Sequence, residues 1–148
     1  MNVTSCAQTI MLHAALHWPE QADVSLWPMA LTYATYLWNI MPRPETELLP
    51  LEIFAQSKQL TPLIHHMHVW GCPVYILDPV LQDGKKLPKW RARSCRGIFL
   101  GHSSHYATTI GNILNLKTQH ISPQFHVIYD DWFMTMYSTG DVDIEQWR

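Results

Sequence analysis

The stretches that decide the fold are VWGCPVYIL at residues 69–77, DGKKLPKWRARSCR at 83–96 and RGIFLG at 96–101. The first and third are rich in the β-branched, aromatic and other apolar residues that favour strands. Asp78-Pro79 closes the first with a turn signal. The second stretch is polar and basic. We therefore predict two strands joined by a long basic loop.

Positive charge is concentrated in that loop. It holds six of the ten Lys and Arg residues of a chain whose formal net charge is −2. They are Lys85, Lys86, Lys89, Arg91, Arg93 and Arg96, and Trp90 lies among them. Clustered cations on a loop are the electrostatic footprint of a module that contacts phosphate. A solvated loop that merely keeps a β-domain in solution would carry the same charges, so charge alone leaves both interpretations open.

Further strands are predicted downstream of the loop. Residues 107–116 and 120–129 read as a third and a fourth strand, joined by a short polar turn at 117–119. Pro123 has no N–H for a β-ladder, so the last strand is expected at an edge or at a bulge. Short strands with regular turns predict a small antiparallel barrel or sandwich. The acidic tail over residues 138–148 is expected to fray.

The first 60 residues have a helical pattern. Small and apolar residues recur at helical spacing over 5–16, and Trp18-Pro19 ends that segment. A second helix is expected after an N-cap at Asp23 or Ser25. Its predicted buried stripe comprises Leu26, Met29, Ala30, Tyr33, Leu37 and Ile40. Pro50 is well placed to open a short third helix that runs to about residue 57.

Composition bounds the class of protein. A hydrophobic content of 47% with 15% charged residues is typical of a globular chain, although the usual charged fraction is ~25%. Residues 24–42 carry no charge and approach the ~20 residues that span a bilayer. Polar residues and prolines interrupt them, so we predict a core helix. Three cysteines without CxxC spacing predict a reducing, intracellular location, nuclear or cytoplasmic.

No catalytic or metal site is assembled by the sequence. Histidines stand near cysteines in two places, with His65, His66 and His68 before Cys72 and with His102 and His105 after Cys95. Neither place has the paired spacing of a zinc site. Asp130 and Asp131 would diverge on a strand, so we expect them to solvate its end. A glycine-rich phosphate loop and a GxSxG elbow are both absent from the sequence.

Five longer stretches carry a family resemblance. They are LHAALHWPEQADVSLWPMALTYATYLWNIMPRPE at 12–45, PLEIFAQSK at 50–58, HVWGCPVYILDPVLQDGKKLPKW at 68–90, RGIFLGHSS at 96–104 and ISPQFHVIYDDWF at 121–133. Together they closely resemble the polyprotein of copia-type LTR retrotransposons, over about residues 5–135. The resemblance implies that residues 1–60 are the last helices of a ribonuclease H-like integrase core. Residues 61–137 would then form a small antiparallel SH3-like β-barrel, followed by the acidic tail.

The resemblance also implies where catalysis lies. Integrases transfer phosphoryl groups with carboxylates around two Mg²⁺ ions. By the resemblance, those carboxylates lie upstream of this chain, and Glu20 and Glu52 are surface residues. We therefore expect no catalytic residue, no metal, no cofactor and no enzymatic activity for the chain on its own. Mg²⁺ is expected only in the full-length integrase.

The predicted function is nucleic-acid binding or complex assembly by the β-module. Lys85, Lys86, Lys89, Arg91, Arg93 and Arg96 would contact phosphates, and Trp90 would pack on a sugar or base. DNA is the expected partner, with RNA as an alternative, together with the rest of the polyprotein and further copies of the chain. No membrane partner is expected.

Two alternatives stay open. The chain is a protein-interaction module whose groove would be lined by Trp70, Tyr75, Phe99, Tyr106 and Phe125, or it is a retroelement remnant without function. In the truncated core, the aromatic residues expected to be left exposed are Trp18, Trp27, Tyr36 and Trp38.

Overall fold

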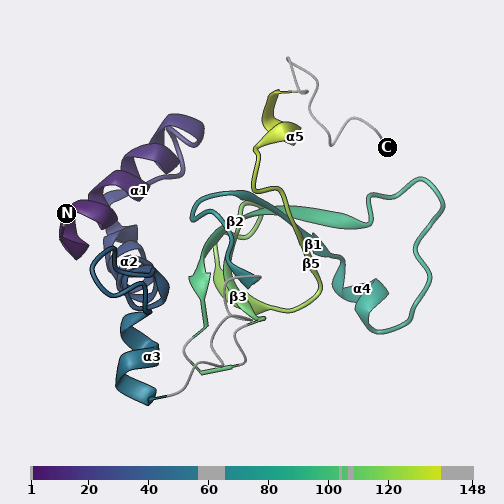
Figure 1. The fold of residues 1–148 in the computed structure, drawn as a ribbon. Helices are drawn as coiled ribbons and strands as arrows, with labels where there is room; N and C mark the ends of the chain where they lie inside the picture. The colour runs from purple at the N-terminus through teal and green to yellow at the C-terminus, as the bar shows by residue number, and fades with distance from the viewer. Residues whose placement is uncertain (1, 57–65, 104, 107–108, 138–148) are drawn as a thin grey trace.

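The computed structural model describes residues 2–56, 66–103, 105–106 and 109–137 (Figure 1). The helices are α1 (Val3–His17), α2 (Trp27–Ile40), α3 (Pro50–Ala55), α4 (Pro79–Gln82) and α5 (Met134–Tyr137), with the 3-10 turn η1 (Val24–Leu26) before α2. The strands are β1 (Pro73–Leu77), β2 (Ser94–His102), β3 (Gly111–Asn115), β4 (Ile121–Gln124) and β5 (Val127–Tyr129). The predicted α+β class is therefore confirmed. The predicted boundary near residue 60 and the acidic tail lie outside the described residues.

The two long helices follow their sequence signals. Asn2 caps α1, because its side-chain oxygen accepts the Ser5 N–H at 2.8 Å. The helix ends at Trp18 as predicted. Asp23 is the residue before η1, but its side chain makes no cap hydrogen bond. α2 follows η1 directly with Leu26 as its N-cap, so neither Asp23 nor Ser25 caps α2 as predicted. The predicted stripe of α2 is confirmed, since four of its six members are buried and Met29 and Leu37 pack against the same core.

All five strands belong to one antiparallel sheet. Their order is β4-β3-β2-β1-β5, with β2 at the centre. Gly97 lies where β2 pairs with both neighbours, opposite Val74 on one side and Asn115 on the other. A Cβ at Gly97 would lie 2.6 Å from Cγ2 of Ile113, so only glycine fits there without rearrangement. The absence of a side chain at Gly97 therefore lets the Ile113 side chain of β3 pack closely against β2.

The prediction of one strand over residues 120–129 is wrong. The segment forms β4 and β5, which lie at opposite edges of the sheet. Val127 donates its N–H to the Phe125 carbonyl at 3.0 Å, and this tight turn redirects the chain between the two strands. A link of two residues spans at most ~11 Å, whereas the outer strands of a flat five-stranded sheet lie ~19 Å apart. The sheet must therefore curl strongly, yet the described ladders do not close it. Pro123 does lie in an edge strand, as predicted.

Helices and sheet share one hydrophobic core. α1 and α2 lie beside the sheet (Figure 1), and alanines such as Ala14 and Ala30 join the same buried cluster as Val74 and Phe99. The buried Trp18 indole donates its Nε1–H to the Gly71 carbonyl at 2.7 Å. Residues on both sides of position 60 therefore contribute to a single core.

The predicted exposure of helix aromatics is correct only in part. Trp27 and Trp38 are exposed, and Tyr36 is partly buried. Trp18 is only 7% exposed, which contradicts the prediction. It is covered because the β-module itself packs against the end of α1. At this junction Gly71 has a φ of +84°, and an added Cβ would lie 2.8 Å from that of Ala14.

Candidate nucleic-acid interface

The basic loop is anchored at its base. The predicted turn at Asp78-Pro79 begins the one-turn helix α4, in which the Asp78 carboxylate accepts the Val80 N–H at 2.9 Å. The Asp78 N–H in turn donates to the Arg93 carbonyl at 2.9 Å. The first and last residues of the excursion between β1 and β2 are thereby tied together. The loop over residues 83–93 starts and ends at fixed points.

The loop presents its charge to solvent. Figure 1 shows it extending from the sheet on the side away from α1, α2 and α3. Residues 83–93 contain five cations and a single carboxylate, Asp83. All five cations are exposed. In the part of the chain that the structure describes, they have no carboxylate within the 4.0 Å of an ion pair.

Side chains of the loop border an open hollow of about 420 Å³. Its lining consists of Leu81, Lys85, Lys86, Leu87, Lys89 and Arg93. Trp90 is 76% exposed, and the Lys89 ammonium lies 5.4 Å from the centre of its ring. The structure therefore gathers four of the predicted phosphate contacts at one hollow. Trp90 and Arg91 follow directly in the same loop.

Arg96 is separated from the other candidates. It lies in β2, and its guanidinium carbon stands 5.0 Å from the centre of the Trp18 ring. Its Nε is buried without a hydrogen-bond partner among the described residues. The side chain thus packs at the junction of α1 and the sheet, away from the loop.

The predicted aromatic groove is not assembled. Trp70 and Phe99 are buried in the core and cannot line a surface groove. Tyr106 and Phe125 are exposed. Of the five aromatics, only Tyr75 borders an apolar hollow of about 310 Å³ between β1 and β5. This hollow, whose lining also includes the exposed Ile128, is the feature that an interaction module would use.

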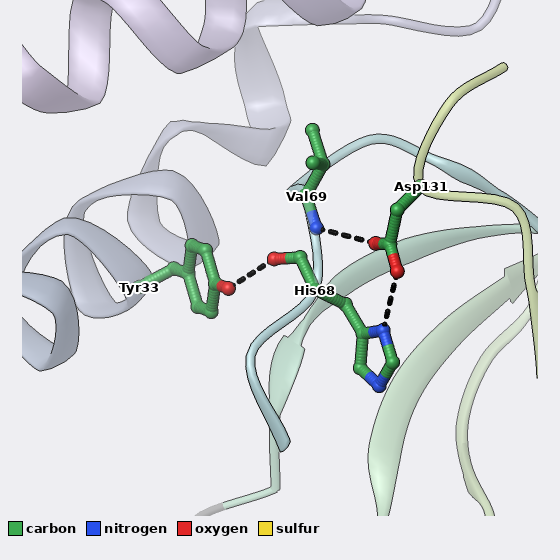
Figure 2. Close-up of polar contacts among 4 residues, drawn as sticks. All are labelled: Tyr33, His68, Val69 and Asp131. Atoms are coloured by element: carbon green, nitrogen blue, oxygen red, sulfur yellow. Dashed lines mark hydrogen bonds and ion pairs between the residues drawn. The ribbon is translucent and has the colours of Figure 1, made fainter. Parts of the chain in front are cut away.

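A second polar cluster was not predicted from the sequence (Figure 2). The Asp131 carboxylate accepts the Val69 N–H at 2.8 Å and lies 2.9 Å from Nδ1 of His68. The Tyr33 hydroxyl donates to the His68 carbonyl. The His68 ring stacks on Tyr129 with 3.5 Å between ring centres. We call this cluster the clasp; its members are Tyr33, His68, Val69, Tyr129 and Asp131. It connects three parts of the chain: α2, the segment before β1, and the end of β5 with the residues that follow.

Asp130 also has a structural role. Its carboxylate accepts N–H groups of Met134 and Thr135 and the Thr135 hydroxyl, the last at 2.6 Å. Desolvation acts to raise the pKa of Asp130, but these hydrogen bonds outweigh it and lower the pKa below its usual value. The prediction that Asp130 and Asp131 solvate a strand end is therefore wrong. Each carboxylate anchors backbone amides of a different segment.

The clasp lacks an activated nucleophile. Cys72 is fully buried, and burial, followed by the charge and hydrogen bonding of Asp131, raises the pKa of its thiol. Burial likewise raises the pKa of Tyr33, and it raises that of Tyr129 to about 12. A protonated, enclosed thiol is the opposite of what nucleophilic catalysis requires. The geometry fits positioning of the backbone.

The described carboxylates do not fit the two-Mg²⁺ centre of an integrase. Asp130 and Asp131 hold backbone amides, and the Glu52 carboxylate accepts the Leu49 N–H at 3.2 Å, at the start of α3. Glu20 is exposed. Among the described residues, three or more His, Cys, Asp or Glu side chains nowhere gather as metal ligands would. His65 lies outside the described residues.

Comparisons with known proteins give no relative: no protein-family model, curated protein or solved structure matches the chain. None of the described helices has the length and apolar character needed to cross a membrane.

Proposed function

We propose that this chain is part of a copia-type retrotransposon integrase and that its β-module binds nucleic acid through the basic loop. In this proposal residues 1–60 derive from the ribonuclease H-like core and residues 61–137 form the SH3-like module. The resemblance of the sequence supports the origin, and the curled five-stranded antiparallel sheet is compatible with such a module. The chain contributes binding, and the carboxylates of strand transfer belong elsewhere in the integrase.

The single observation that carries the proposal is the state of the five loop cations. They project into solvent from an anchored loop and lack ion-pair partners among the described residues. Lys and Arg in this state attract phosphates, and each phosphate contact releases condensed counterions. The remainder of the chain carries more carboxylates than cations. The positive charge of the chain is therefore concentrated in the loop.

The test is the salt dependence of binding to duplex DNA. Five phosphate contacts predict that log K falls against log salt with a slope of roughly −4.5, and Arg96, which packs on Trp18, is not expected to add to it. The variant K85S/K86S/R91S/R93S should lose most of its affinity and bring the slope close to −1. A slope near zero for the unmodified chain would refute the proposal.

A matched pair of double variants controls for net charge. K85S/K86S removes two loop cations, and R43S/K117S removes two exposed cations outside the loop. Both changes alter the total charge equally. We expect only the first to weaken binding and to reduce the slope by roughly two. Equal losses would mean that the attraction depends on total charge and not on the loop.

The second candidate is a protein-interaction module. It is favoured by the apolar hollow at the β1–β5 edge, where Ile128 is 73% exposed beside Tyr75 and Leu77. The edge of β5 away from β1 has no described partner strand, and such edges pair with extended peptides. Unchanged DNA affinity in K85S/K86S/R91S/R93S, with loss of a polyprotein contact in I128S, would favour this candidate.

A further inference from the structure

Trp90 is presented at the tip of a turn within the basic loop. The Arg91 N–H donates to the Pro88 carbonyl at 3.0 Å, which closes a four-residue turn with Lys89 and Trp90 at its centre. Proline at the first position restricts the backbone before the turn. The turn places the Trp90 backbone at its centre, and the ring is exposed to solvent. It is not packed into the core.

Trp27, Trp38, Trp90 and Trp132 are all exposed, but of these four only Trp90 lies between two cations in the sequence. A Trp side chain is a large apolar surface that proteins normally bury. Trp90 is 76% exposed, and the cations Lys89 and Arg91 flank it in the sequence. The Lys89 ammonium, 5.4 Å from the ring centre, favours a ring that stays beside the cationic hollow. An aromatic face and phosphate-binding cations are thus offered together.

The two kinds of nucleic acid make different use of such a tip. A duplex offers phosphates to the loop, but its base faces are covered by neighbouring base pairs. An unpaired base exposes a π-face that stacks on an aromatic side chain, worth about 1–3 kcal/mol per base. The open hollow beside Lys89 is lined by Lys85, Lys86 and Arg93 as well, so phosphate-binding cations surround the position next to the ring.

We propose that Trp90 makes the basic loop a reader of unpaired bases, so that single-stranded nucleic acid is the ligand class recognised at this site. The inference rests on the proposed function, because the loop cations supply the phosphate contacts. The inference adds a reason for the loop to prefer single-stranded over duplex nucleic acid. The cations hold either form of nucleic acid, and stacking on Trp90 occurs only where a base is unpaired.

The experiment compares W90A with the unmodified chain on three probes: oligothymidylate, oligouridylate and a relaxed, covalently closed circular duplex. The closed circle has no free end on which Trp90 can stack. Fluorescence anisotropy measures the single strands, and competition measures the circle. W90A should weaken single-strand binding roughly five- to hundredfold and should change duplex binding less than about twofold. W90F, which keeps a stacking ring, should retain most of the affinity.

The matched control is W132A. Trp132 is 83% exposed and lies after β5, outside the loop. It tests whether loss of any exposed indole weakens binding, and we expect no change on any probe. Because both side chains are exposed, neither substitution should alter the urea midpoint. Loss in W90A on oligothymidylate alone assigns DNA as the ligand, loss on oligouridylate alone assigns RNA, and loss on both assigns the shared unpaired base.

Two outcomes overturn the inference. One is equal weakening of all three probes in W90A, and the other is no weakening of any. The failure of the proposed function gives a different result, since K85S/K86S/R91S/R93S would then bind every probe as the unmodified chain does. If the charge variant loses all three probes and W90A loses none, only the role of Trp90 is refuted.

Discussion

The basic loop and the clasp use polar side chains in opposite ways. In the loop, five cations stand in solvent without ion-pair partners among the described residues. In the clasp, one carboxylate holds a backbone amide and an imidazole, and the imidazole stacks on Tyr129. The polar groups of the clasp make contacts within the chain, and these contacts stabilise the fold. The loop leaves its polar groups available to a ligand. Stability and binding are therefore expected to respond to different substitutions.

The largest effect on stability is expected at Asp131. Asp131→Asn keeps the shape but removes the charge and one acceptor, so either the His68 Nδ1–H or the Val69 N–H loses a good partner. Because these side chains are partly exposed, we expect the loss to be close to the net value of one hydrogen bond, about 0.5–1.5 kcal/mol. Urea unfolding at neutral pH measures the change. Asp83→Asn, the same substitution in the exposed loop, is the control and should leave the unfolding free energy nearly unchanged. Similar losses in both variants would show that the Asp131 contacts add nothing to the stability of the fold.

The clasp and exposed positions should also differ in how the unfolding free energy changes at high pH. Burial raises the pKa of Tyr129 from 10.0 to about 12, so the folded state favours the neutral phenol. The stability of the folded state that depends on a neutral Tyr129 phenol is fully present below pH 10 and is lost as the pH rises towards 12. Unfolding free energy should therefore fall across that window. In Tyr129→Phe, which has no phenol to ionise, the fall should be shallower, and Tyr106→Phe at an exposed position should match the unmodified chain. An unaltered slope in Tyr129→Phe would contradict the assignment.

The smallest effect on stability is expected in the loop itself. K85S/K86S removes two exposed ammonium groups whose described surroundings contain no ion-pair partner. Surface changes of this kind usually alter stability by less than about 0.5 kcal/mol. The same variant should weaken DNA binding clearly, which sharpens the division between the two regions. A loss of stability comparable to that of Asp131→Asn would mean that the loop cations have internal partners after all.

Local signals in the sequence determined a good part of the fold. The helical spacing over residues 5–16, the stripe of α2 and the prolines at helix starts predicted α1, α2 and α3 correctly. The apolar runs around Val74 and Phe99 predicted β1 and β2. The concentration of Lys and Arg predicted the basic loop. These features depend on neighbouring residues along the chain, so no knowledge of packing was needed to find them.

Tertiary structure decided the features that depend on distant contacts. The segment 120–129 became two edge strands because of a tight turn at Phe125 and of pairing with β3 and β1. Arg96 packs against the ring of Trp18 and not beside the loop cations, although Arg93 precedes it by only three residues. His68 contacts the Asp131 carboxylate, although the two residues are 63 positions apart in the sequence. Sequence alone specifies which side chains are charged or apolar, but burial and pairing follow from which elements pack together, and that is a property of the whole fold.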